Sequence, residues 1–377
     1  MDRFNKIFII NNGFSAFGLN LIDMTLLWIL YLALKNPILY IPVASAKPIG
    51  TLLLSSFTGY IADKYDRKKL FAITGTIHRI LPIFIVYFVI ISFNPILAVI
   101  LYVVRTGLTI VTTNTITPSF IQNLPEDKMK KVMFYNRAVK ESSTILSIVI
   151  WPLFYAFYSG WTVIPGIILA TIGFALIFTL PLGGKGGKKV KFREALKEYR
   201  RKEIFFISMT TAVSQGALGM VYLYSAAIIQ ILHGNTIQYT LAQLGFYLSW
   251  LIGPWMMTKF NNVTKLVVTS FAMYFLVFIV LALKNPWLIG LSTGSVGIGD
   301  SLTEIIWIKA MRMARQELMA SVLGIDEFIT AGFRLGYGSI AGTLYATAFF
   351  AVPIIGVITI AGVALAYTKN DVWKIKI

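Results

Sequence analysis

The sequence contains no cysteine, only two histidines and few acidic residues. The absence of cysteine excludes disulfide bonds and metal sites built from thiolates. Charged residues make up 13% of the 377 residues, whereas 57% are hydrophobic. Because a soluble domain needs a polar surface that this composition does not supply, the composition predicts an integral membrane protein.

Signatures of enzymes are also missing. The chain has no His-Glu-x-x-His motif, no phosphate-binding Gly-Lys-Ser/Thr loop and no metal-binding cluster, which disfavours ATP-driven pumping. Gly297 to Asp300 matches the Gly-x-Gly-Asp element of intramembrane aspartyl proteases, and Tyr65-Asp66 matches their second element. That chemistry needs two aspartates at similar depth, whereas Asp66 lies in a loop. We therefore predict a protein that is not an enzyme and has no cofactor.

Long apolar runs of membrane-spanning length recur along the whole chain. A bilayer core about 30 Å thick needs roughly 20 apolar residues per helix. The first run is too long for the apolar region of a cleavable signal peptide and has no small-residue cleavage site. The predicted fold is all-α, with twelve transmembrane helices over residues 7–34, 38–61, 70–92, 95–121, 132–158, 161–182, 204–232, 238–259, 265–283, 286–309, 320–347 and 350–368.

The positive charges alternate from one loop to the next. Most of the loop lysines and arginines fall in one set of alternate loops, and the opposite set holds Lys35 and Lys284 only. The positive-inside rule then places both termini in the cytoplasm and makes the protein a multi-pass protein of the cell membrane. The net charge of +18 is explained by topology and by attraction to anionic lipid, so no nucleic-acid partner is expected.

One linker divides six predicted spans from six. Residues 183–187 are Gly-rich, and residues 188–203 form a basic segment in which Phe192, Ala195, Leu196 and Tyr199 share one helical face. This pattern predicts an amphipathic helix on the inner membrane surface. The expected domains are an N-terminal six-helix bundle over residues 1–182, a cytoplasmic linker over 183–203 and a C-terminal six-helix bundle over 204–377.

Short motifs of the first half of the chain recur in the second half at a nearly constant offset. Asn94-Pro95 recurs as Asn285-Pro286, an offset of 191 residues, and Gly59 corresponds to Gly253 at an offset of 194. Together these matches indicate a duplicated six-helix unit, so the two bundles should be pseudo-symmetric.

The loop between the second and third spans contains Gly59, Asp63, Asp66, Arg67 and Lys68. Its pattern resembles the cytoplasmic loop signature of the major facilitator superfamily, Gly-x-x-Ala-Asp-Arg/Lys-x-x-Arg-Arg/Lys-Arg/Lys. The resemblance extends over nearly the whole chain and implies a secondary transporter that moves a small solute by alternating access. It implies that the loop is a latch between the halves that favours the outward-open state. The alternative is a charged turn that only marks topology.

Three further segments are similar to the macrolide-efflux and siderophore-export branch. They are residues 14–18, the Asp66-Arg67 pair and residues 118–136. This resemblance implies export, as a proton-coupled antiporter. The fifth span lacks the Gly-rich ending of many proton antiporters, because Trp151-Pro152 stands there. Proton-coupled uptake of a polar or anionic metabolite therefore remains an alternative, as does a non-transporting receptor or scaffold.

Charged residues lie inside the predicted spans, mostly on helices that line the cavity in the superfamily. A charge at membrane depth costs at least about 2.5–3.5 kcal/mol on insertion scales, so it usually faces a partner or a water-filled cavity. We expect the cavity for substrate and protons to be formed by Asp23, Lys47, Arg105, Asp300, Glu304 and Arg334.

The cavity residues have separate expected roles. Asp300, with Glu304 or Asp23, would carry the proton, because neighbouring carboxylates repel and one of them then protonates more readily. Arg105, Lys47 and Arg334 would orient the substrate. A static ion pair between Asp300 and Arg334 is the main structural alternative. For Lys47 the alternative is packing, and for Asp23 a position at the membrane interface.

A second group of charges belongs to the cytoplasmic side. Arg67 and Lys68 can pair with Asp326 and Glu327 at the start of the eleventh span. Arg137 and Glu141 on the fifth span read as an inner gate or a structural network rather than as substrate ligands. The expected partners are a small-molecule substrate, protons and the lipid bilayer, and we expect a monomer.

Overall fold

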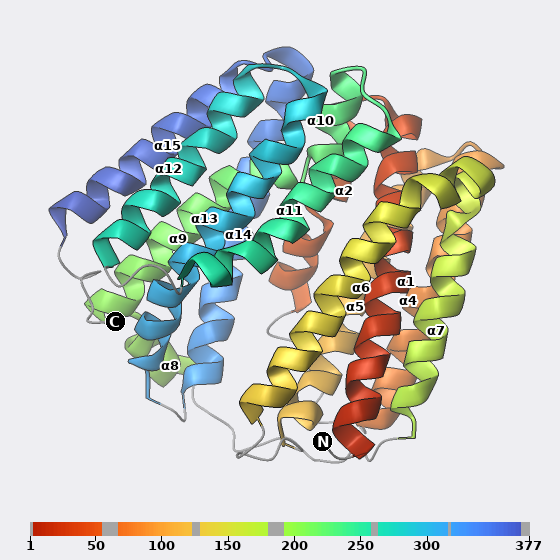
Figure 1. Ribbon diagram of the computed structural model, residues 1–377, viewed down its shortest axis with the longest axis horizontal. Coiled ribbons are helices and arrows are strands. Elements are labelled where there is room, and N and C mark those ends of the chain that lie inside the picture. The colour runs from red at the N-terminus through yellow and green to blue at the C-terminus, as the bar shows by residue number, and fades with distance from the viewer. Residues whose placement is uncertain are drawn as a thin grey trace. The chain divides into compact units, whose positions relative to one another are not determined.

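The chain folds into two compact units. The computed structural model describes residues 3–54, 67–122, 129–179, 192–257, 263–315 and 318–370, and the regular elements in these ranges are all helices (Figure 1). Unit 1 comprises residues 1–35 and 49–187, and unit 2 comprises residues 36–48 and 188–377. The short segment 36–48, expected in the N-terminal bundle, therefore packs with unit 2.

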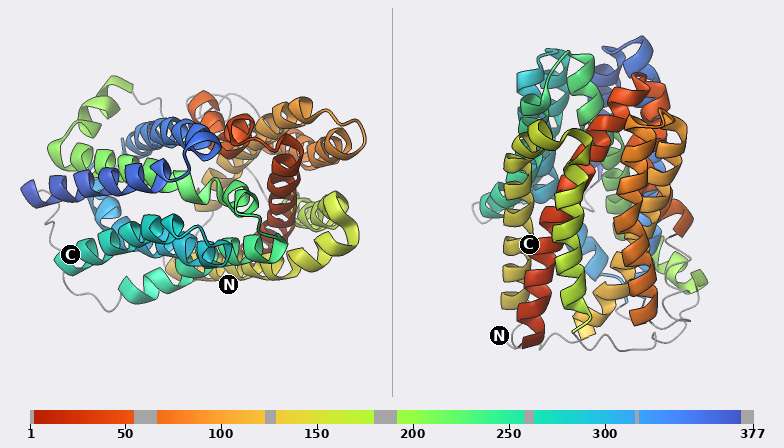
Figure 2. Two further views of the ribbon diagram at one scale, coloured as in Figure 1. Left: turned by 90° about the horizontal axis from the view of Figure 1, so that it is seen from above. Right: turned by 90° about the vertical axis from the view of Figure 1, so that its right-hand side faces the viewer.

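In unit 1, α1 packs against α6 and α7, and α4 packs against α5. The N-terminus and the end of α7 lie at the same end of this unit (Figures 1 and 2). The elements are α1 (Arg3–Leu34), α4 (Arg67–Ile90), α5 (Pro95–Gln122), α6 (Met129–Tyr158), the 3-10 helix η2 (Ser159–Thr162) and α7 (Val163–Ile177).

Unit 2 repeats this scheme. Its first long helix, α9, packs against α14 and α15, and α12 packs against α13, which also contacts α11. The elements are α2 (Pro37–Ala44), α8 (Phe192–Tyr199), α9 (Lys202–Tyr222), α10 (Ser225–Ile231), α11 (Thr236–Met257), α12 (Val263–Ala282), η3 (Pro286–Leu288), α13 (Ile289–Arg312), α14 (Met319–Thr347) and α15 (Ala351–Lys369).

One turn recurs at three Asn-Pro sites. The residue before each asparagine has a positive φ of about 50°: Lys35 (50°), Phe93 (49°) and Lys284 (51°). Each asparagine side chain then accepts a hydrogen bond from a backbone N–H two or three residues later, at 2.8, 3.2 and 3.0 Å respectively. The asparagine caps a helix that begins at the proline, whose missing N–H is not needed at that position. This turn explains why the predicted starts at 38, 95 and 286 lie within one residue of the observed ones.

Fewer helices than twelve meet a composition test for a membrane span. Among the described residues, seven helical stretches are long and apolar enough, or eight if the bent pair Pro37–Ala44 and Ala46–Leu54 is one span. The helices α13 and α14 have 24 and 29 residues but fall short. Their Gly, Ser and Thr content and their internal charges lower the mean hydropathy. The prediction of an all-helical membrane protein is confirmed, and the count of twelve stays a prediction.

Two predicted spans are broken rather than continuous. The span predicted over 38–61 bends by 44° between Ala44 and Ala46. The span predicted over 204–232 divides into α9 and α10, with a turn at Leu223 and Tyr224. At this turn the Tyr224 hydroxyl donates to the Gly338 carbonyl oxygen over 2.7 Å. A hydrogen bond from a tyrosine to a distant carbonyl has no local sequence signal, which is why the second break was missed.

The helix α2 is packed tightly against α14. The Tyr40 side chain is fully buried, and its ring meets that of Tyr224 edge-on, with 6.0 Å between centroids. A Cβ atom at Gly342 would lie 2.2 Å from Cγ1 of Ile41. A glycine at this position therefore permits the close approach of the two helices.

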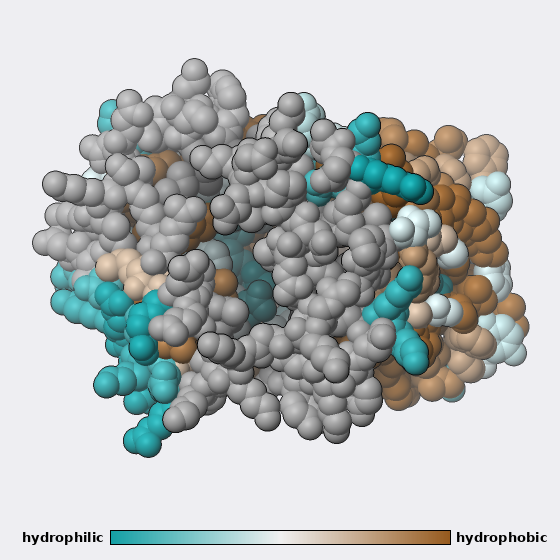
Figure 3. Space-filling view, turned by 90° about the horizontal axis from the view of Figure 1, so that it is seen from below, coloured by the Kyte–Doolittle hydropathy of each residue, from teal (hydrophilic) through white to brown (hydrophobic). Residues whose placement is uncertain are grey.

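The outer surface of unit 1 is apolar. Exposed isoleucines occur every four residues on α7, at Ile164, Ile168 and Ile172, and several large apolar side chains are exposed on α4. Figure 3 shows the resulting broad hydrophobic surface. A contiguous apolar surface of this kind suits contact with lipid chains.

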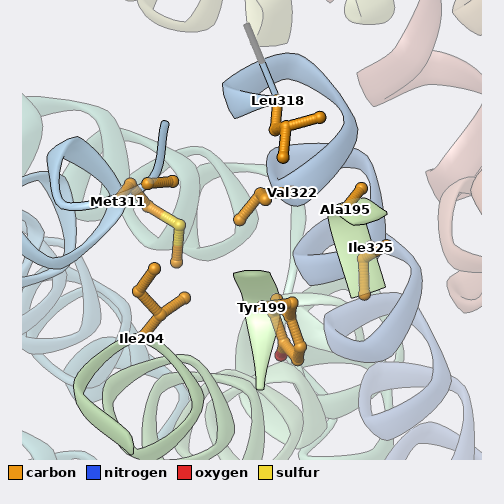
Figure 4. Close-up of a cluster of buried hydrophobic side chains, with 8 residues drawn as sticks. Ala195, Tyr199, Ile204, Met311, Leu318, Val322 and Ile325 are labelled. Atoms are coloured by element: carbon orange, nitrogen blue, oxygen red, sulfur yellow. The ribbon is translucent and has the colours of Figure 1, made fainter. Parts of the chain in front are cut away.

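The linker helix α8 docks on protein. Ala195 and Tyr199 on its apolar face are fully buried, and they pack with residues of α9, α13 and α14 (Figure 4). Burial raises the pKa of the Tyr199 hydroxyl to about 12. In the structure, the apolar side chains of α8 thus pack on unit 2, whereas the sequence predicted a helix on the inner membrane surface.

Glu198 fixes the polar side of this docked helix. Its carboxylate accepts from Arg201 Nη1 at 2.9 Å, from the Arg315 backbone N–H at 3.3 Å and from Arg315 Nε at 3.4 Å. Arg201 also donates to the Met313 carbonyl oxygen at 2.8 Å. The hydrogen bond from Arg201, aided by the N–H and charge of Arg315, outweighs burial and holds the pKa of Glu198 below its usual range.

Acid should release α8. A carboxyl group whose pKa is lower in the folded state stabilises that state above its ordinary pKa, near 4.5, and loses the effect as the pH falls through the lowered pKa. We expect hydrogen exchange in α8 to accelerate below about pH 4.5, relative to α12. In Glu198→Gln the exchange should be faster at pH 7 and should lose this pH dependence. Equal protection in both proteins across that range would contradict the role of Glu198.

Candidate functional site

In unit 1, a buried guanidinium is paired with a partly open carboxylate. Arg105 on α5 is 3% exposed, and its Nη1 lies 2.5 Å from Oδ1 of Asp23 on α1, whose side chain is 45% exposed. The Arg105 Nε has no hydrogen-bond partner. An unpaired buried cation would be costly, so Asp23 supplies the charge that allows Arg105 to be buried. The structure thus joins two of the predicted cavity residues.

A second arginine of unit 1 is satisfied without a carboxylate. Arg79 on α4 donates from Nη1 to the Gly75 carbonyl oxygen at 2.7 Å and from Nε to the Ala170 carbonyl oxygen at 3.3 Å. Its guanidinium carbon lies 4.2 Å from the ring centroid of Phe174. These contacts bind α4 to α7, so in the structure Arg79 has a packing role.

Polar side chains connect α1 to α6 at three levels. The pairs are Asn12–Asn136 at 2.6 Å, Asn20–Ser147 at 2.8 Å and Thr25–Trp151 at 3.0 Å. On the same helix α6, Glu141 is half-buried, and the side chain of Arg137 lies outside the described residues. The sequence analysis singled out none of these pairs, because a single polar residue in a span has no distinctive spacing.

In unit 2, an amide separates the two predicted charges. Asp300 on α13 is buried and accepts a hydrogen bond from the Tyr274 hydroxyl of α12 at 2.9 Å. The Gln215 side chain on α9 lies beside the Asp300 carboxylate. The carbonyl oxygen of Gln215 accepts from Arg334 Nη2 of α14 at 2.8 Å.

This geometry differs from a static ion pair. Within the described residues, the ion pairs closer than 4.0 Å do not include one between Asp300 and Arg334. Both charges act on each other through space, and Glu304 adds a second negative charge near Asp300. Arg334 Nε has no hydrogen-bond partner. Four helices therefore converge on a group with one carboxylate, one amide and one guanidinium.

Sequence analysis overlooked Gln215, although a signal was present. Gln215 follows Asp23 by 192 residues, which falls within the offsets of the internal repeat. Each of the two residues hydrogen-bonds a guanidinium, Arg105 in unit 1 and Arg334 in unit 2. Extending the repeat from motifs to single polar residues would have identified it.

The other predicted residues are separate from these two groups. Lys47 is exposed and follows the bend after α2. Asp326 is buried and accepts from Trp307 Nε1 at 3.0 Å, while Glu327 is exposed. Lys68 donates to the Phe178 carbonyl oxygen at 3.2 Å.

Part of the predicted loop motif is not described by the structure. Gly59, Asp63 and Asp66 lie outside the described residues, as does the side chain of Arg67, where α4 begins. The latch that these residues were predicted to form therefore stays a prediction.

Solved structures match the chain over almost its whole length. The nucleoside transporter NupG is 16% identical, with a TM-score of 0.76 and coverage of 100% of both chains. A bacterial homologue of the iron transporter ferroportin, in an inward-facing state, is 10% identical with a TM-score of 0.71 over 99% of this chain and 98% of that one. A D-xylose-proton symporter is 12% identical with a TM-score of 0.68 over 96% and 97%.

The chain has the major facilitator fold. The fold predicted from the loop motif is confirmed, whereas the macrolide-efflux and siderophore-export branch stays a prediction. The matched structures are those of transporters and not of enzymes. No family model and no curated protein sequence matches the chain.

The pair in unit 1 can be tested for its contribution to stability. We expect Asp23→Asn to lower the thermal midpoint of the purified protein, because Arg105 would lose its charged partner. In a protein that already carries Arg105→Gln, the further substitution Asp23→Asn should lower the thermal midpoint much less. A double-mutant cycle should then give a coupling of about 0.5–3 kcal/mol, as for contacting residues in one network. Additive effects would contradict the pairing.

Proposed function

We propose that the chain is a secondary transporter that moves a small solute by alternating access and uses protons as the coupling ion. The observation that supports this is the environment of Asp300. The side chains next to its carboxylate are those of the neutral residues Tyr274 and Gln215, and Arg334 donates to the carbonyl oxygen of Gln215 instead of to Asp300. A buried carboxylate without a contacting cation can accept a proton at a small cost, because the proton removes a poorly compensated charge.

The carboxylates and the cations of the two units then have different tasks. Asp300, assisted by Glu304 or by Asp23, binds and releases the proton. Arg334 and Arg105 orient the solute, and Lys47 adds a further positive charge. The change in charge at Asp300 alters the attraction of Arg334 for the amide and for the solute, which couples the two binding events.

The direction of transport has two candidates. The sequence resemblance to efflux and export proteins favours proton-coupled export. Uptake is favoured by the match to a structure named as a D-xylose-proton symporter. The match to a nucleoside transporter favours a small polar solute in either case. A non-transporting receptor or scaffold is the third candidate, but it gives no reason to retain Asp300 and Arg334 inside the helices.

The topology and the cytoplasmic latch belong to the same proposal. We propose that the protein is a monomer of the cell membrane with both termini in the cytoplasm; the alternation of lysines and arginines between loops supports this orientation. Arg67 and Lys68 would then pair with Asp326 and Glu327 in the outward-open state and release them in the other state, while Asp63 would face a helix N-terminus.

Proton coupling can be measured in vesicles. In proteoliposomes with an imposed pH gradient, we expect addition of a transported solute to cause a proton flux in the wild-type protein. In Asp300→Asn that flux should fall to the level of protein-free vesicles, because the amide cannot take up a proton. The direction of solute movement relative to the gradient separates export from uptake.

A matched control removes an exposed carboxylate of the same unit. Glu194→Gln on α8 should leave the flux unchanged, because Glu194 is exposed and away from the group around Asp300. A wild-type flux in Asp300→Asn would contradict the coupling role of Asp300. The lack of flux with any solute of a broad panel would contradict the proposal as a whole.

Alternating access predicts a change in reactivity at Asp23. The chain has no native cysteine, so a single introduced thiol can be followed without background. Asp23→Cys should react with a membrane-impermeant maleimide, at a rate that changes when the pH gradient or a solute is added. Ser270→Cys, at a position with 0% exposure, should stay unreactive throughout. A rate at position 23 that never changes would contradict alternating access at this residue.

A further inference from the structure

Aromatic side chains adjoin the charged group of unit 2. Tyr222 ends α9, and its ring stacks on that of Phe246 in α11, with 5.4 Å between centroids and 17° between planes. Trp250 meets Phe246 edge-on at 6.4 Å. These three side chains are half-buried, whereas Tyr224 and Tyr345 of another aromatic group in the unit are buried. The group of Tyr222, Phe246 and Trp250, here termed the aromatic platform, therefore still has ring surface to offer.

Tyr222 joins this platform to the polar groups. Its side chain neighbours that of Arg334; Arg334 donates to Gln215 over 2.8 Å, and Gln215 neighbours Asp300. Donors and acceptors thus adjoin the edge of a set of aromatic rings. The guanidinium also keeps one unused donor, because Arg334 Nε has no hydrogen-bond partner.

The charges restrict the ligand. Arg334 contributes one positive charge, and Asp300 with Glu304 contributes two negative charges. A strongly anionic solute would be attracted by the one positive charge but repelled by the two negative charges. A neutral solute would not be repelled by either carboxylate. Ring faces favour a planar ligand, since every nucleobase presents a π-face that stacks on aromatic side chains. Guanidinium and amide groups match the donor and acceptor edges of such bases.

We propose that the aromatic platform with Gln215 and Arg334 is a binding subsite for a neutral, planar heteroaromatic solute of the nucleobase or nucleoside type. The ring of the solute stacks on the platform, and its polar edge faces Gln215 and Arg334. The inference deepens the proposed transport function and rests on it for its biological meaning. It replaces the anionic metabolite among the predicted substrates by an uncharged one.

Binding to the purified full-length protein tests the subsite. Calorimetric titration would use uridine and adenosine, with ribose and uridine monophosphate as comparison probes. We expect both nucleosides to bind, ribose to show no binding, and the monophosphate to bind more weakly than uridine because of its charge. Equal affinity for ribose and uridine would overturn the proposal, as would tighter binding of the monophosphate.

Substitutions assign the binding to the platform. Phe246→Ala should raise the dissociation constant by roughly 5- to 150-fold, the range that loss of one stacked aromatic ring gives, whereas Phe246→Tyr should leave it close to the wild-type value. Trp287→Ala, which removes an exposed aromatic side chain, should have no effect. Wild-type affinity in a Phe246→Ala protein of unchanged thermal midpoint would overturn the subsite; if that protein does not fold, Phe246→Leu takes its place under the same criterion.

Transport assays separate this inference from the proposed function. Proton-coupled flux with a solute that has no aromatic ring, unaffected by Phe246→Leu, would overturn the subsite and leave the transporter in place. Nucleoside binding that depends on Phe246, without flux in vesicles under any gradient, would support the subsite and contradict the transport proposal.

Discussion

The burial of guanidinium groups among apolar helices is the constraint on which both units depend. On insertion scales a charge at the centre of a membrane helix costs about 2.5–3.5 kcal/mol. Each unit offsets this cost by bringing a polar side chain of its first long helix to an arginine of a later one. Asp23 of α1 meets Arg105 of α5, and Gln215 of α9 meets Arg334 of α14. The packing of α9 on α14 therefore carries an electrostatic requirement as well as an apolar one.

The two units meet this requirement with different chemistry, and the difference bears on function. In unit 1 a carboxylate contacts the cation directly, so the two charges of the pair cancel. In unit 2 the residue that corresponds to Asp23, 192 residues later in the sequence, is Gln215, which carries an amide instead of a carboxylate. The amide binds the cation without neutralising it and leaves the carboxylate of Asp300 to neutral donors.

Much of the fold could be predicted from the sequence because its signals are local. The Asn-Pro turns after Lys35, Phe93 and Lys284 combine a left-handed residue, a capping side chain and a proline, so they set helix starts wherever they occur. The loop motif gave the fold family for a similar reason, since a charged turn at fixed spacing can be read along the chain. The apolar face of α8 could also be predicted from the sequence. The surface on which it packs could not, because an amphipathic helix can lie on lipid or on protein.

The remainder depends on contacts between distant segments. The break after α9 involves a hydrogen bond from Tyr224 to Gly338, and the partner of Arg334 proved to be Gln215 rather than the nearest carboxylate. Hydropathy assigned α13 and α14 their spans only weakly, because the charges and small residues that serve a polar interior lower their apolar content.

The connections between the units impose a further condition on any motion. Because residues 36–48 pack with unit 2, the chain passes between the units after residues 35, 48 and 187. Under the proposed alternating access the units move relative to each other, so all three connections have to accommodate that motion. The first two enclose only the short segment that α2 anchors on unit 2, where Tyr40 packs on Tyr224 and Ile41 on Gly342 of α14. A motion that separates this segment from the rest of unit 2 would expose a buried tyrosine, whereas a motion that keeps it docked would concentrate the change at Lys35 and Pro48. Burial of the Tyr40 side chain therefore favours the motion that keeps the segment docked.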